Sequence, residues 1–376
     1  MAIVFGLLTL CSLGYCALAL WSARNFRRGG RTHLGGFAPP VTILKPLKGT
    51  DPSAYESLRS HCVQEYPEYE LIFGVNDDTD PAAELVRRLM AEFPSRPMRL
   101  VVGTKVLGTN RKVSNLVQML EPARHRHVVV NDSDISVPPD YLQRILAPFE
   151  SARTGMVTCP YRGIAGHTLG SKLESLGIST EFIPGVLTAR KLEGGVHFAL
   201  GSTLAMTRES LAAIGGLETL VDYLADDFEL GARISAAGYD VVLSDCVVEN
   251  HLPDYSFAEF IAHQLRWGRS TRHSRPWGYA GLIFTFPLPW AVLTVGFGAR
   301  ELWAWGLLGV TLALRYALAL SVGWGILRDP QVRKYWWLVP LRDFVALGLW
   351  IGGFTGREVN WRGERFVLEK GKLRPA

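Results

Sequence analysis

The chain has 376 residues, of which 48% are hydrophobic and 20% charged, and its 40 Lys and Arg residues exceed its 35 Asp and Glu residues by five. This composition is too apolar for a disordered protein, and the modest positive charge does not indicate a nucleic-acid partner. The five cysteines are widely spaced and form no Cys-x-x-Cys pair, which argues against a disulfide framework and a structural zinc site.

The first apolar segment, residues 2–21, contains no charged residue. A helix of about 20 such residues crosses the hydrocarbon core of a bilayer. No basic residue precedes the segment, whereas four arginines follow it between residues 24 and 31, and this pattern favours an uncleaved anchor over a cleaved signal peptide. We therefore expect an integral membrane protein with a transmembrane anchor at residues 1–21. The positive-inside rule then places the following domain in the cytoplasm.

Residues 22–278 have the composition of a soluble domain, with alternating strand and helix patterns. Strands are predicted at residues 41–46, 69–75, 98–102 and 128–130, and helices from Asp51-Pro52 and at residues 81–93 and 110–120. Such alternation predicts an α/β fold with a mostly parallel sheet, which binds its ligands at the carboxyl ends of the strands. The glycine signatures of dehydrogenases, P-loop NTPases and α/β-hydrolases do not occur in a suitable setting.

A first acidic cluster, residues 76–80, directly follows the second predicted strand. One interpretation is a turn in which Asp80, before Pro81, caps the next helix. The other is that Asp77, Asp78 and Asp80 supply carboxylates that accept hydrogen bonds from a nucleoside base and ribose. The local sequence leaves both interpretations open.

A second acidic cluster places Asp132 and Asp134 directly after the buried run of valines at residues 128–130. Two carboxylates at this spacing can converge on Mg²⁺ or Mn²⁺, hard cations that prefer oxygen ligands. A divalent cation there would bridge a diphosphate and neutralise its charge as it leaves. The alternative is a solvated acidic turn.

A third acidic pair, Asp226 and Asp227, precedes a helix predicted at residues 228–237 and closed by Gly238. We expect Asp226 to cap this helix, because carboxylates are favoured at helix N-termini. The other carboxylate is a candidate general base toward a hydroxyl group.

An amphipathic helix is predicted at residues 256–269, just before the C-terminal apolar region. Arg266 on this helix can bind a phosphate through its planar guanidinium, and Trp267 can line an acceptor pocket. The alternative is an interfacial helix with a snorkelling arginine, and the two interpretations are compatible.

After residue 278 the chain becomes apolar again, in segments at residues 279–299, 302–327 and 335–356. Three complete spans would leave the basic tail, residues 357–376, on the opposite side of the membrane from the preceding domain, although basic segments are typical of the cytoplasmic side. We therefore expect one segment of the region 279–356 to be re-entrant or interfacial. Because charges within apolar segments are costly and usually paired, we also predict an ion pair between Arg315 and Asp343.

Several motifs together resemble the ceramide glucosyltransferase-like family of inverting membrane glycosyltransferases, which have the GT-A fold. They are VTILKPLKGTDP (41–52), EYPEYELIFGVNDDTDPA (65–82), LGTNRKVSNL (107–116), VVVNDSD (128–134), GSTLAMTRESLAAIGG (201–216), LADDFELGARI (224–234) and HQLRW (263–267). The resemblance implies a Rossmann-like sheet flanked by helices, a UDP-sugar donor, a lipid acceptor and a divalent cation.

The resemblance also implies roles for individual residues. Asp132 matches the site that acts with the metal and the sugar nucleotide, Asp227 the catalytic base, and Arg266-Trp267 the Arg-Trp of the family's Q/RxxRW motif. Lys112, within LGTNRKVSNL, is a further candidate for binding the sugar nucleotide. For the first acidic site, the Asp-Pro step favours Asp80, whereas the end of the strand favours Asp77.

Two positions depart from the family pattern. His263 stands at the Q/R position, where it can still donate a hydrogen bond to the phosphate or acceptor side. Asp134 completes a full Asp-x-Asp motif, whereas some relatives carry another residue there, so metal dependence can differ.

The expected reaction is one inverting transfer of a hexose from a UDP-sugar to a lipid hydroxyl. Transfer of glucose to ceramide is the first expectation. The alternative is a hopanoid-pathway enzyme that uses UDP-N-acetylglucosamine, and the compact loops fit a bacterial inner-membrane protein. A polysaccharide synthase is less favoured, because few apolar segments remain for a polymer channel. A non-enzymatic membrane scaffold is also less favoured, because it needs no separate acidic sites.

Overall fold

The computed structural model describes residues 1–29, 36–51, 53–361 and 364–375. Arg31, Pro52, Arg362 and Gly363, which contribute to the expectations above, lie outside the described residues. The chain forms two compact units. A helical unit comprises Met1–Gly30, Arg162–Leu192 and Leu252–Arg362, and a sheet unit comprises Arg31–Tyr161, Glu193–His251 and Gly363–Ala376. Both units draw on segments far apart in the sequence, and the domain boundaries expected at residues 21, 278 and 356 stay a prediction.

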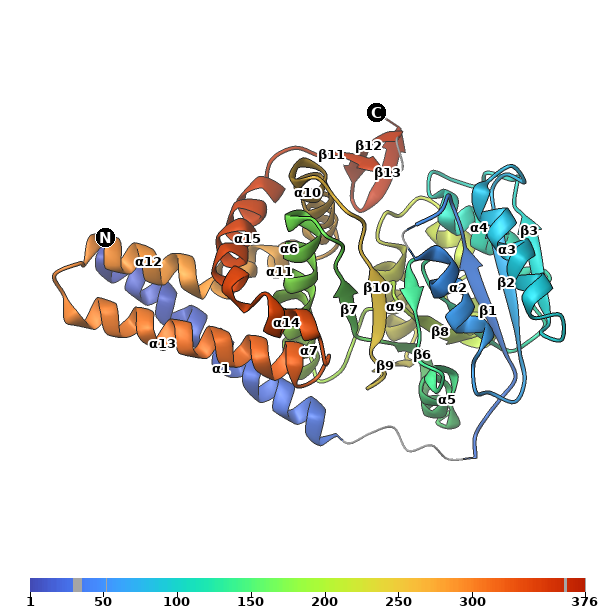
Figure 1. Cartoon of the computed structure of the whole chain (residues 1–376), viewed down its shortest axis with the longest axis horizontal. Coiled ribbons are helices and arrows are strands. Elements are labelled where there is room, and N and C mark those ends of the chain that lie inside the picture. Colours follow the sequence, from blue (N-terminus) through green and yellow to red (C-terminus); the bar gives the residue numbers. More distant parts are fainter. Residues whose placement is uncertain (30–35, 52, 362–363, 376) are drawn as a thin grey trace. The chain divides into compact units, whose positions relative to one another are not determined.

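The sheet unit contains a seven-stranded mixed sheet with the strand order β3-β2-β1-β4-β8-β6-β9 (Figure 1). Its strands are β1 (Val41–Pro46), β2 (Tyr69–Val75), β3 (Met98–Val102), β4 (His127–Val130), β6 (Thr154–Thr158), β8 (Leu204–Thr207) and β9 (Asp240–Leu243). β1 pairs in parallel with β2 and β4, β2 with β3, and β6 with β9. Only β8, which is antiparallel to both β4 and β6, breaks the parallel arrangement. The predicted mostly parallel α/β sheet is therefore confirmed.

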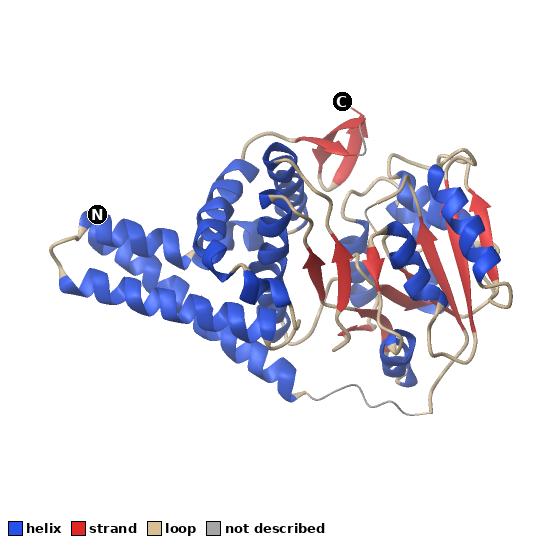
Figure 2. Cartoon of the chain, viewed as in Figure 1, coloured by secondary structure: helices blue, strands red, loops and turns tan. Residues whose placement is uncertain are grey.

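The predicted bounds of the first strands and helices agree with the observed ones. The predicted strands at 41–46, 69–75 and 98–102 coincide with β1, β2 and β3. All residues of β1 and β2 are buried, as expected for parallel strands covered on both faces. The helices of this unit, which flank the strands (Figure 2), are α2 (Ala54–Cys62), α3 (Pro81–Glu92), α4 (Arg111–Leu120), α5 (Tyr141–Leu146), α8 (Arg208–Ala213) and α9 (Asp226–Ala236), with 3₁₀ turns at Ala147–Glu150 and Leu217–Leu220.

Short strands complete this unit. β5 (Ile135–Ser136) pairs antiparallel with β10 (Val248–His251). At the C-terminus, β12 (Glu364–Glu369) and β13 (Lys372–Pro375) form an antiparallel hairpin. The segment described above only as a basic tail is therefore folded. Of the other short strands, β11 (Glu358–Trp361) belongs to the helical unit, and β7 (Tyr161–Ile164) begins at the last residue of a sheet-unit segment and continues into the helical unit.

The helical unit is built on α1 (Ala2–Arg28), which packs along α12 (Pro287–Phe297) and α13 (Leu302–Ala319) (Figure 1). Within the described residues, α1 and the helix from Leu302 to Trp324 are long and apolar enough to cross a membrane. A third span results if the bent pair Pro276–Thr285 and Pro287–Phe297, which meet at 52°, is counted as one. The predicted anchor lies inside α1, and the expectation that one C-terminal segment is re-entrant or interfacial stays a prediction.

The remaining helices of this unit are α6 (Leu169–Gly177), α7 (Ile183–Leu192), α10 (Phe257–Ser274), α11 (Pro276–Gly281), α14 (Pro330–Lys334) and α15 (Val339–Gly353). Its shorter turns are the π-helical segments Ile178–Phe182 and Leu320–Trp324 and the 3₁₀ segments Leu282–Thr285 and Trp336–Leu338.

The predicted ion pair between Arg315 and Asp343 is confirmed. Arg315 Nε donates to both carboxylate oxygens at 2.9 Å, and Nη2 donates to Oδ1 at 2.7 Å. The third nitrogen, Nη1, donates to the carbonyl of Thr180 at 3.1 Å. Both side chains are at most 4% exposed, so the pair places two opposite charges in the interior of the helical unit, with each arginine nitrogen hydrogen-bonded.

Candidate active site

Two of the three acidic clusters lie at the carboxyl ends of parallel strands that flank β1. Residues 76–80 follow β2, a loop at residues 47–51 follows β1, and Asp132 and Asp134 follow β4. Because β1 lies between β2 and β4, all three loops leave the same edge of the sheet, the edge at which α/β sheets bind ligands.

In the first cluster, the three carboxylates have different partners. Asp80 accepts hydrogen bonds from the Gly49 amide at 2.9 and 3.1 Å and caps α3 by accepting from the Ala82 amide at 2.9 Å. Its predicted capping role is therefore confirmed, and it also fixes the loop after β1. Asp78 pairs with Arg87 at 2.7 Å.

Asp77 is the first carboxylate after β2 and is exposed. It accepts bonds from the amide and hydroxyl of Thr79, at 2.9 and 2.8 Å, and these bonds lower the pKa of its carboxyl group. Asp77 is therefore ionised and accessible at the end of the strand.

The turn after β4 is held in place by a buried lysine. Lys45, in β1, is fully buried, and its Nζ donates to the backbone carbonyl of Asp132 at 2.7 Å. Burial lowers the pKa of Lys45 to about 7, although Asp134 and Asp132 oppose this shift. From the loop after β1, Asp51 accepts a hydrogen bond from the Ser133 hydroxyl at 2.6 Å. These contacts fix the backbone of the turn and leave the Asp132 side chain 40% exposed.

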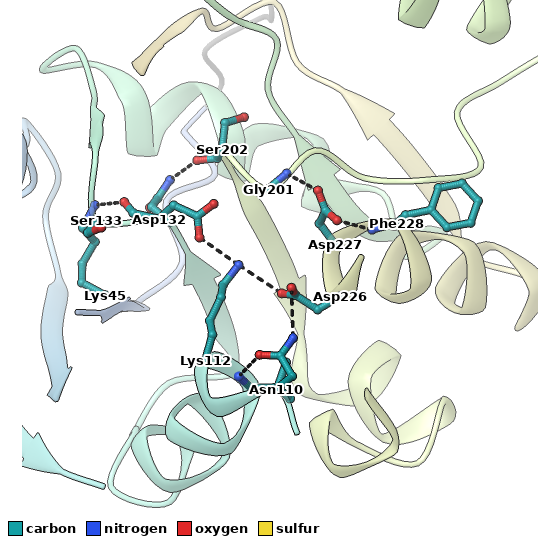
Figure 3. A network of polar contacts seen from close by, with 12 residues as sticks. Lys45, Asn110, Lys112, Asp132, Ser133, Gly201, Ser202, Asp226, Asp227 and Phe228 are labelled. Carbon is teal, nitrogen blue, oxygen red and sulfur yellow. Dashed lines mark hydrogen bonds and ion pairs between the residues drawn. The ribbon is translucent and has the colours of Figure 1, made fainter. Parts of the chain in front are cut away.

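Lys112 joins the second acidic site to the third. Its Nζ lies 2.8 Å from Asp132 Oδ1 and 3.0 Å from Asp226 Oδ2 (Figure 3). The lysine side chain is only 9% exposed. Burial alone would lower the pKa of Lys112, but the carboxylates of Asp132 and Asp226 outweigh burial and raise it. The ammonium group is therefore a permanent positive charge between two carboxylates.

The expectation that Asp226 caps the following helix is wrong. α9 begins at Asp226 itself, the preceding residue is Ala225, and no side chain caps the helix. The Asp226 carboxylate instead faces Lys112, and Asn110 Nδ2 lies 3.5 Å from its Oδ1. A buried ammonium group attracts the carboxylate more strongly than the backbone amides of the helix do.

Asp227 is held at the start of α9 by two backbone amides. Oδ2 accepts from Gly201 at 2.9 Å and Oδ1 accepts from Phe228 at 2.8 Å (Figure 3). Burial, and then the neighbouring charge of Asp226, raise the pKa of Asp227 to about 6 despite the opposing charge of Lys112. A carboxylate with this pKa is ionised at neutral pH but still accepts a proton readily.

Gly201 lies between the second and third acidic sites. A β-carbon at this position would lie 3.1 Å from Asp132 Oδ2 and 3.2 Å from Asp227 Oδ2. The two carboxylates therefore face one backbone position from opposite sides, and a glycine leaves this space open.

The surroundings of Asp132 and Asp134 determine whether this pair can hold a divalent cation. Among the described residues, no three His, Cys, Asp or Glu side chains are grouped so as to hold a metal. However, Asp134 Oδ1 is buried without a hydrogen-bond partner. Burial, followed by the charges of Asp132 and Asp51, raises the pKa of Asp134 to about 7. Mg²⁺ commonly uses one or two carboxylates together with substrate phosphates, so the two residues fit a cation that shares a diphosphate.

His263, Arg266 and Trp267 lie on α10, in the helical unit. His263 Nδ1 is 3.2 Å from Glu174 Oε2, and its ring centroid is 5.0 Å from that of Trp267. The predicted helix 256–269 is confirmed and continues to Ser274, with a capping box formed by Ser256 and Glu259. His263 and Trp267 are therefore in contact on α10 in the helical unit, whereas Lys112, Asp132, Asp226 and Asp227 are brought together in the sheet unit.

Sequence reasoning missed three residues of the site: Lys45, Asn110 and Gly201. The sequence indicated only that Lys45 lies near the end of a strand. Asn110 combines two roles, because its side chain caps α4 by accepting from the Val113 amide and donates to the carbonyl of Tyr223. Its position before a helical pattern was a signal for the cap but gave no indication of the long-range contact.

The sequence pattern of Glycosyl transferase family 21 matches residues 4–374. The chain belongs to this family. It is therefore a glycosyltransferase, and the resemblance to ceramide glucosyltransferase-like enzymes is confirmed.

Relatives of this family 21 enzyme include two proteins of Caenorhabditis elegans. Ceramide glucosyltransferase 3 is 27% identical over 232 residues, which cover 61% of this chain and 50% of the relative. Ceramide glucosyltransferase 1 is 24% identical over 347 residues, which cover 89% of this chain and 72% of the relative. The match thus spans half of one relative and about three quarters of the other.

A solved structure with a similar fold is a mannosyltransferase from Pyrobaculum calidifontis in complex with GDP-Man and Mn²⁺. The TM-score is 0.55 at 18% sequence identity, and the match covers 93% of this chain and 98% of that one. The similarity supports the GT-A-like α/β fold of the family 21 enzyme.

Proposed function

We propose that this family 21 enzyme transfers a hexose from a UDP-sugar to a hydroxyl group of a membrane lipid, with inversion at the anomeric carbon. The observation that carries the proposal is the placement of Asp132 and Asp227 on the two sides of Gly201. This places a candidate base beside the carboxylate expected to act with the donor diphosphate.

Each acidic site has a proposed role in binding or chemistry. Asp77, exposed at the end of β2, binds the nucleoside, because Asp80 already caps α3 and fixes the loop after β1. Asp132 and Asp134 hold the divalent cation. When bound, the cation neutralises charge on the diphosphate. Lys112 holds the carboxylates of Asp132 and Asp226 in position through its two ion pairs, and it contributes positive charge near the donor.

Asp227 acts as the general base. Its carboxylate accepts the proton of the acceptor hydroxyl as the hydroxyl oxygen bonds to the anomeric carbon. The bond from that carbon to the UDP oxygen breaks on the opposite face, and the electron pair leaves with UDP. The Gly201 and Phe228 amides orient the carboxylate, and its pKa of about 6 suits a base that works near neutral pH.

A membrane lipid is the acceptor we favour, because the chain has candidate membrane-spanning helices. Ceramide, with UDP-glucose as the donor, is supported by the names of the relatives. A hopanoid polyol with UDP-N-acetylglucosamine is the competing outcome of the test below. His263, Arg266 and Trp267 on α10 are proposed to act on the acceptor and phosphate side.

The C-terminal hairpin provides an argument about membrane topology. It belongs to the sheet unit, where the Leu373 amide donates to the carbonyl of Asp222 at 2.7 Å. The chain must therefore cross the membrane an even number of times between α10 and the hairpin. The bent pair counted as one span, together with α13, gives the required even number. We place the sheet unit and the tail in the cytoplasm, facing a bacterial inner membrane.

The same topology places the turn between α12 and α13 outside. Ala2, at the start of α1, lies beside Gly298 in this turn. A cysteine introduced by Arg300→Cys should react with a membrane-impermeant maleimide in intact cells. A cysteine introduced by Lys370→Cys should react only after the cells are opened. The reverse pattern would contradict the proposed orientation.

The function itself is tested with purified protein in detergent and Mg²⁺ or Mn²⁺. UDP-glucose and UDP-N-acetylglucosamine are each combined with ceramide, diacylglycerol and a hopanoid polyol, and the glycolipid is identified by mass spectrometry. We expect glucosylceramide. A hopanoid that carries the amino sugar would replace the proposed donor and acceptor. Failure of every lipid to accept sugar from either donor would contradict the proposed lipid glycosyltransferase.

A further inference from the structure

We propose that the C-terminal hairpin β12–β13 is a positioning element that holds the loop before Asp226 and Asp227. This inference rests on the proposed base role of Asp227. The loop at residues 221–224 leads directly into α9. Its backbone is contacted on one side by residues 108–110 and on the other by the hairpin, so the position of α9 depends on both.

The contacts from the hairpin are made by its turn and by β13. The Leu224 amide donates to the carbonyl of Gly371 at 3.2 Å, and the Leu373 amide donates to the carbonyl of Asp222 at 2.7 Å. Between these two bonds, Tyr223 and Lys372 form a β-bridge. The hairpin therefore pairs with the loop through backbone groups, as an additional strand would.

The turn that joins β12 and β13 has the conformation of a tight hairpin turn. Lys370 and Gly371 both have positive φ values, of 49° and 81°. Two consecutive residues with positive φ are characteristic of the type I′ turn, whose twist matches that of the flanking strands. Leu373 and Leu368 are 0% and 1% exposed. The hairpin is thus anchored by buried side chains as well as by hydrogen bonds.

Thr109 connects the hairpin with the opposite side of the loop. Its hydroxyl lies within hydrogen-bond distance of the Asp222 carboxylate, at 3.1 Å, and of the Leu373 carbonyl, at 3.2 Å. Next to it, Asn110 binds the carbonyls of Val221 and Tyr223, at 2.6 and 2.7 Å, through its backbone and side-chain nitrogens. Lys112, three residues beyond Thr109, pairs with Asp226. One short segment therefore touches the hairpin, the loop and the carboxylate that precedes the base.

Tyr223 adds a side-chain contact to this arrangement. Two positively charged groups lie over its ring. The Arg233 guanidinium, on α9, is 4.7 Å from the ring centroid, and the Lys372 ammonium, on the hairpin, is 5.2 Å from it. Such contacts are attractive, and here they link α9 to β13 through the loop. Loss of the hairpin would remove support from both ends of the loop, and misplacement of a catalytic group by about 1 Å costs about 100-fold in rate.

The first test compares Thr109→Val with Thr109→Ser in the full-length enzyme. The valine variant loses the hydroxyl, so we expect kcat for sugar transfer to fall about fivefold, with the KM for UDP-sugar unchanged. The serine variant keeps the hydroxyl and should restore kcat. Arg374→Gln is the matched control, because Arg374 pairs with Glu369 and both side chains are exposed. Equal kcat values for the valine variant and the wild type would overturn the proposal.

A second measurement separates this inference from the proposed function. Hydrogen exchange of the Leu224 amide reports the hairpin contact whether or not the correct lipid acceptor is known. We expect faster exchange over residues 221–227 in full-length Thr109→Val, but not in Arg374→Gln. Unchanged exchange would refute the positioning role, whereas faster exchange in an enzyme without lipid transfer would refute only the proposed reaction.

Discussion

Each unit contains a buried ion pair, and the two ion pairs, Arg315–Asp343 and Lys112–Asp132, differ in how exposed their carboxylates are. In the helical unit, Arg315 and Asp343 are at most 4% exposed, and all three guanidinium nitrogens have partners. In the sheet unit, Lys112 is almost as deeply buried, but its partner Asp132 is 40% exposed, and Asp227 has a pKa raised to about 6.

This difference separates a structural ion pair from a site that can react. A fully paired group has no remaining capacity to bind a ligand, and its removal should change stability alone. A carboxylate that is partly exposed, or that is close to protonation at neutral pH, retains capacity for a cation or a proton. Incomplete pairing at the carboxyl edge of the sheet is thus the physical sign of function in this enzyme.

The largest expected effect is on the chemistry of the sheet unit. Asp227→Asn keeps the shape of the side chain and an oxygen for the Gly201 amide, but it removes the base. We expect transfer to fall about a thousandfold, while UDP with Mn²⁺ still stabilises the protein in a thermal melt. Normal turnover with weakened UDP binding would assign Asp227 to the donor instead.

In the helical unit, Arg315→Leu should destabilise the protein without altering the chemistry of the remaining folded fraction. Removing one partner of a buried pair typically costs about 3–5 kcal/mol. The double variant Arg315→Asp with Asp343→Arg should recover only part of this loss, because the wild-type arginine also bonds Thr180. Melting temperatures in detergent provide the comparison. A single variant as stable as the wild type would contradict a structural role for the Arg315–Asp343 ion pair.

Lys112→Met should affect both stability and activity. It leaves Asp226 buried without its cation, and we expect a loss of about 2 kcal/mol, below the usual cost for a buried pair because Asp132 is partly exposed. The KM for UDP-sugar should rise as Asp132 loses its position. Chemical denaturation and steady-state kinetics measure the two effects, and a variant changed only in stability would make Lys112 comparable to Arg315.

The pH dependence should be the smallest of these effects near neutrality. Asp227 must be deprotonated to accept a proton, and burial raises its pKa above the ordinary value to about 6. The contribution of Asp227 to the transfer rate should therefore fall about tenfold for each pH unit below this pKa. A pH–rate profile of kcat/KM checks this expectation. A rate that increases as the pH falls below 6 would exclude an ionised Asp227 as the base.

The sequence predicted the first half of the sheet because its strands are short apolar runs bounded by Pro and Gly. β1, β2 and β3 coincide with the predictions. The antiparallel insertion of β8 between β4 and β6 could not be predicted from such patterns, because each strand looks the same in either direction. Asp77, Asp132 and Asp134 were predicted as site residues because acidic clusters coincide with the ends of predicted strands.

The contacts within the site were predictable only where they are local. Asp80 caps the helix that immediately follows it, as its position before Pro81 indicated. Asp226 has the same local setting but binds Lys112, a residue more than 100 positions away. The basic residues of the tail gave no indication of the hairpin, and its contacts with residues 222–224 include backbone hydrogen bonds, which leave little trace in the sequence. Long-range contacts and backbone contacts thus explain most of what the sequence did not reveal.

The anomeric configuration of the glycolipid product tests the central claim most directly. A donor with an α-linked sugar is supplied, and the configuration of the purified product is determined by NMR. A single displacement assisted by Asp227 predicts a β-linked product, with no product from Asp227→Asn. An α-linked product would require a second displacement, and it would contradict the proposed role of Asp227.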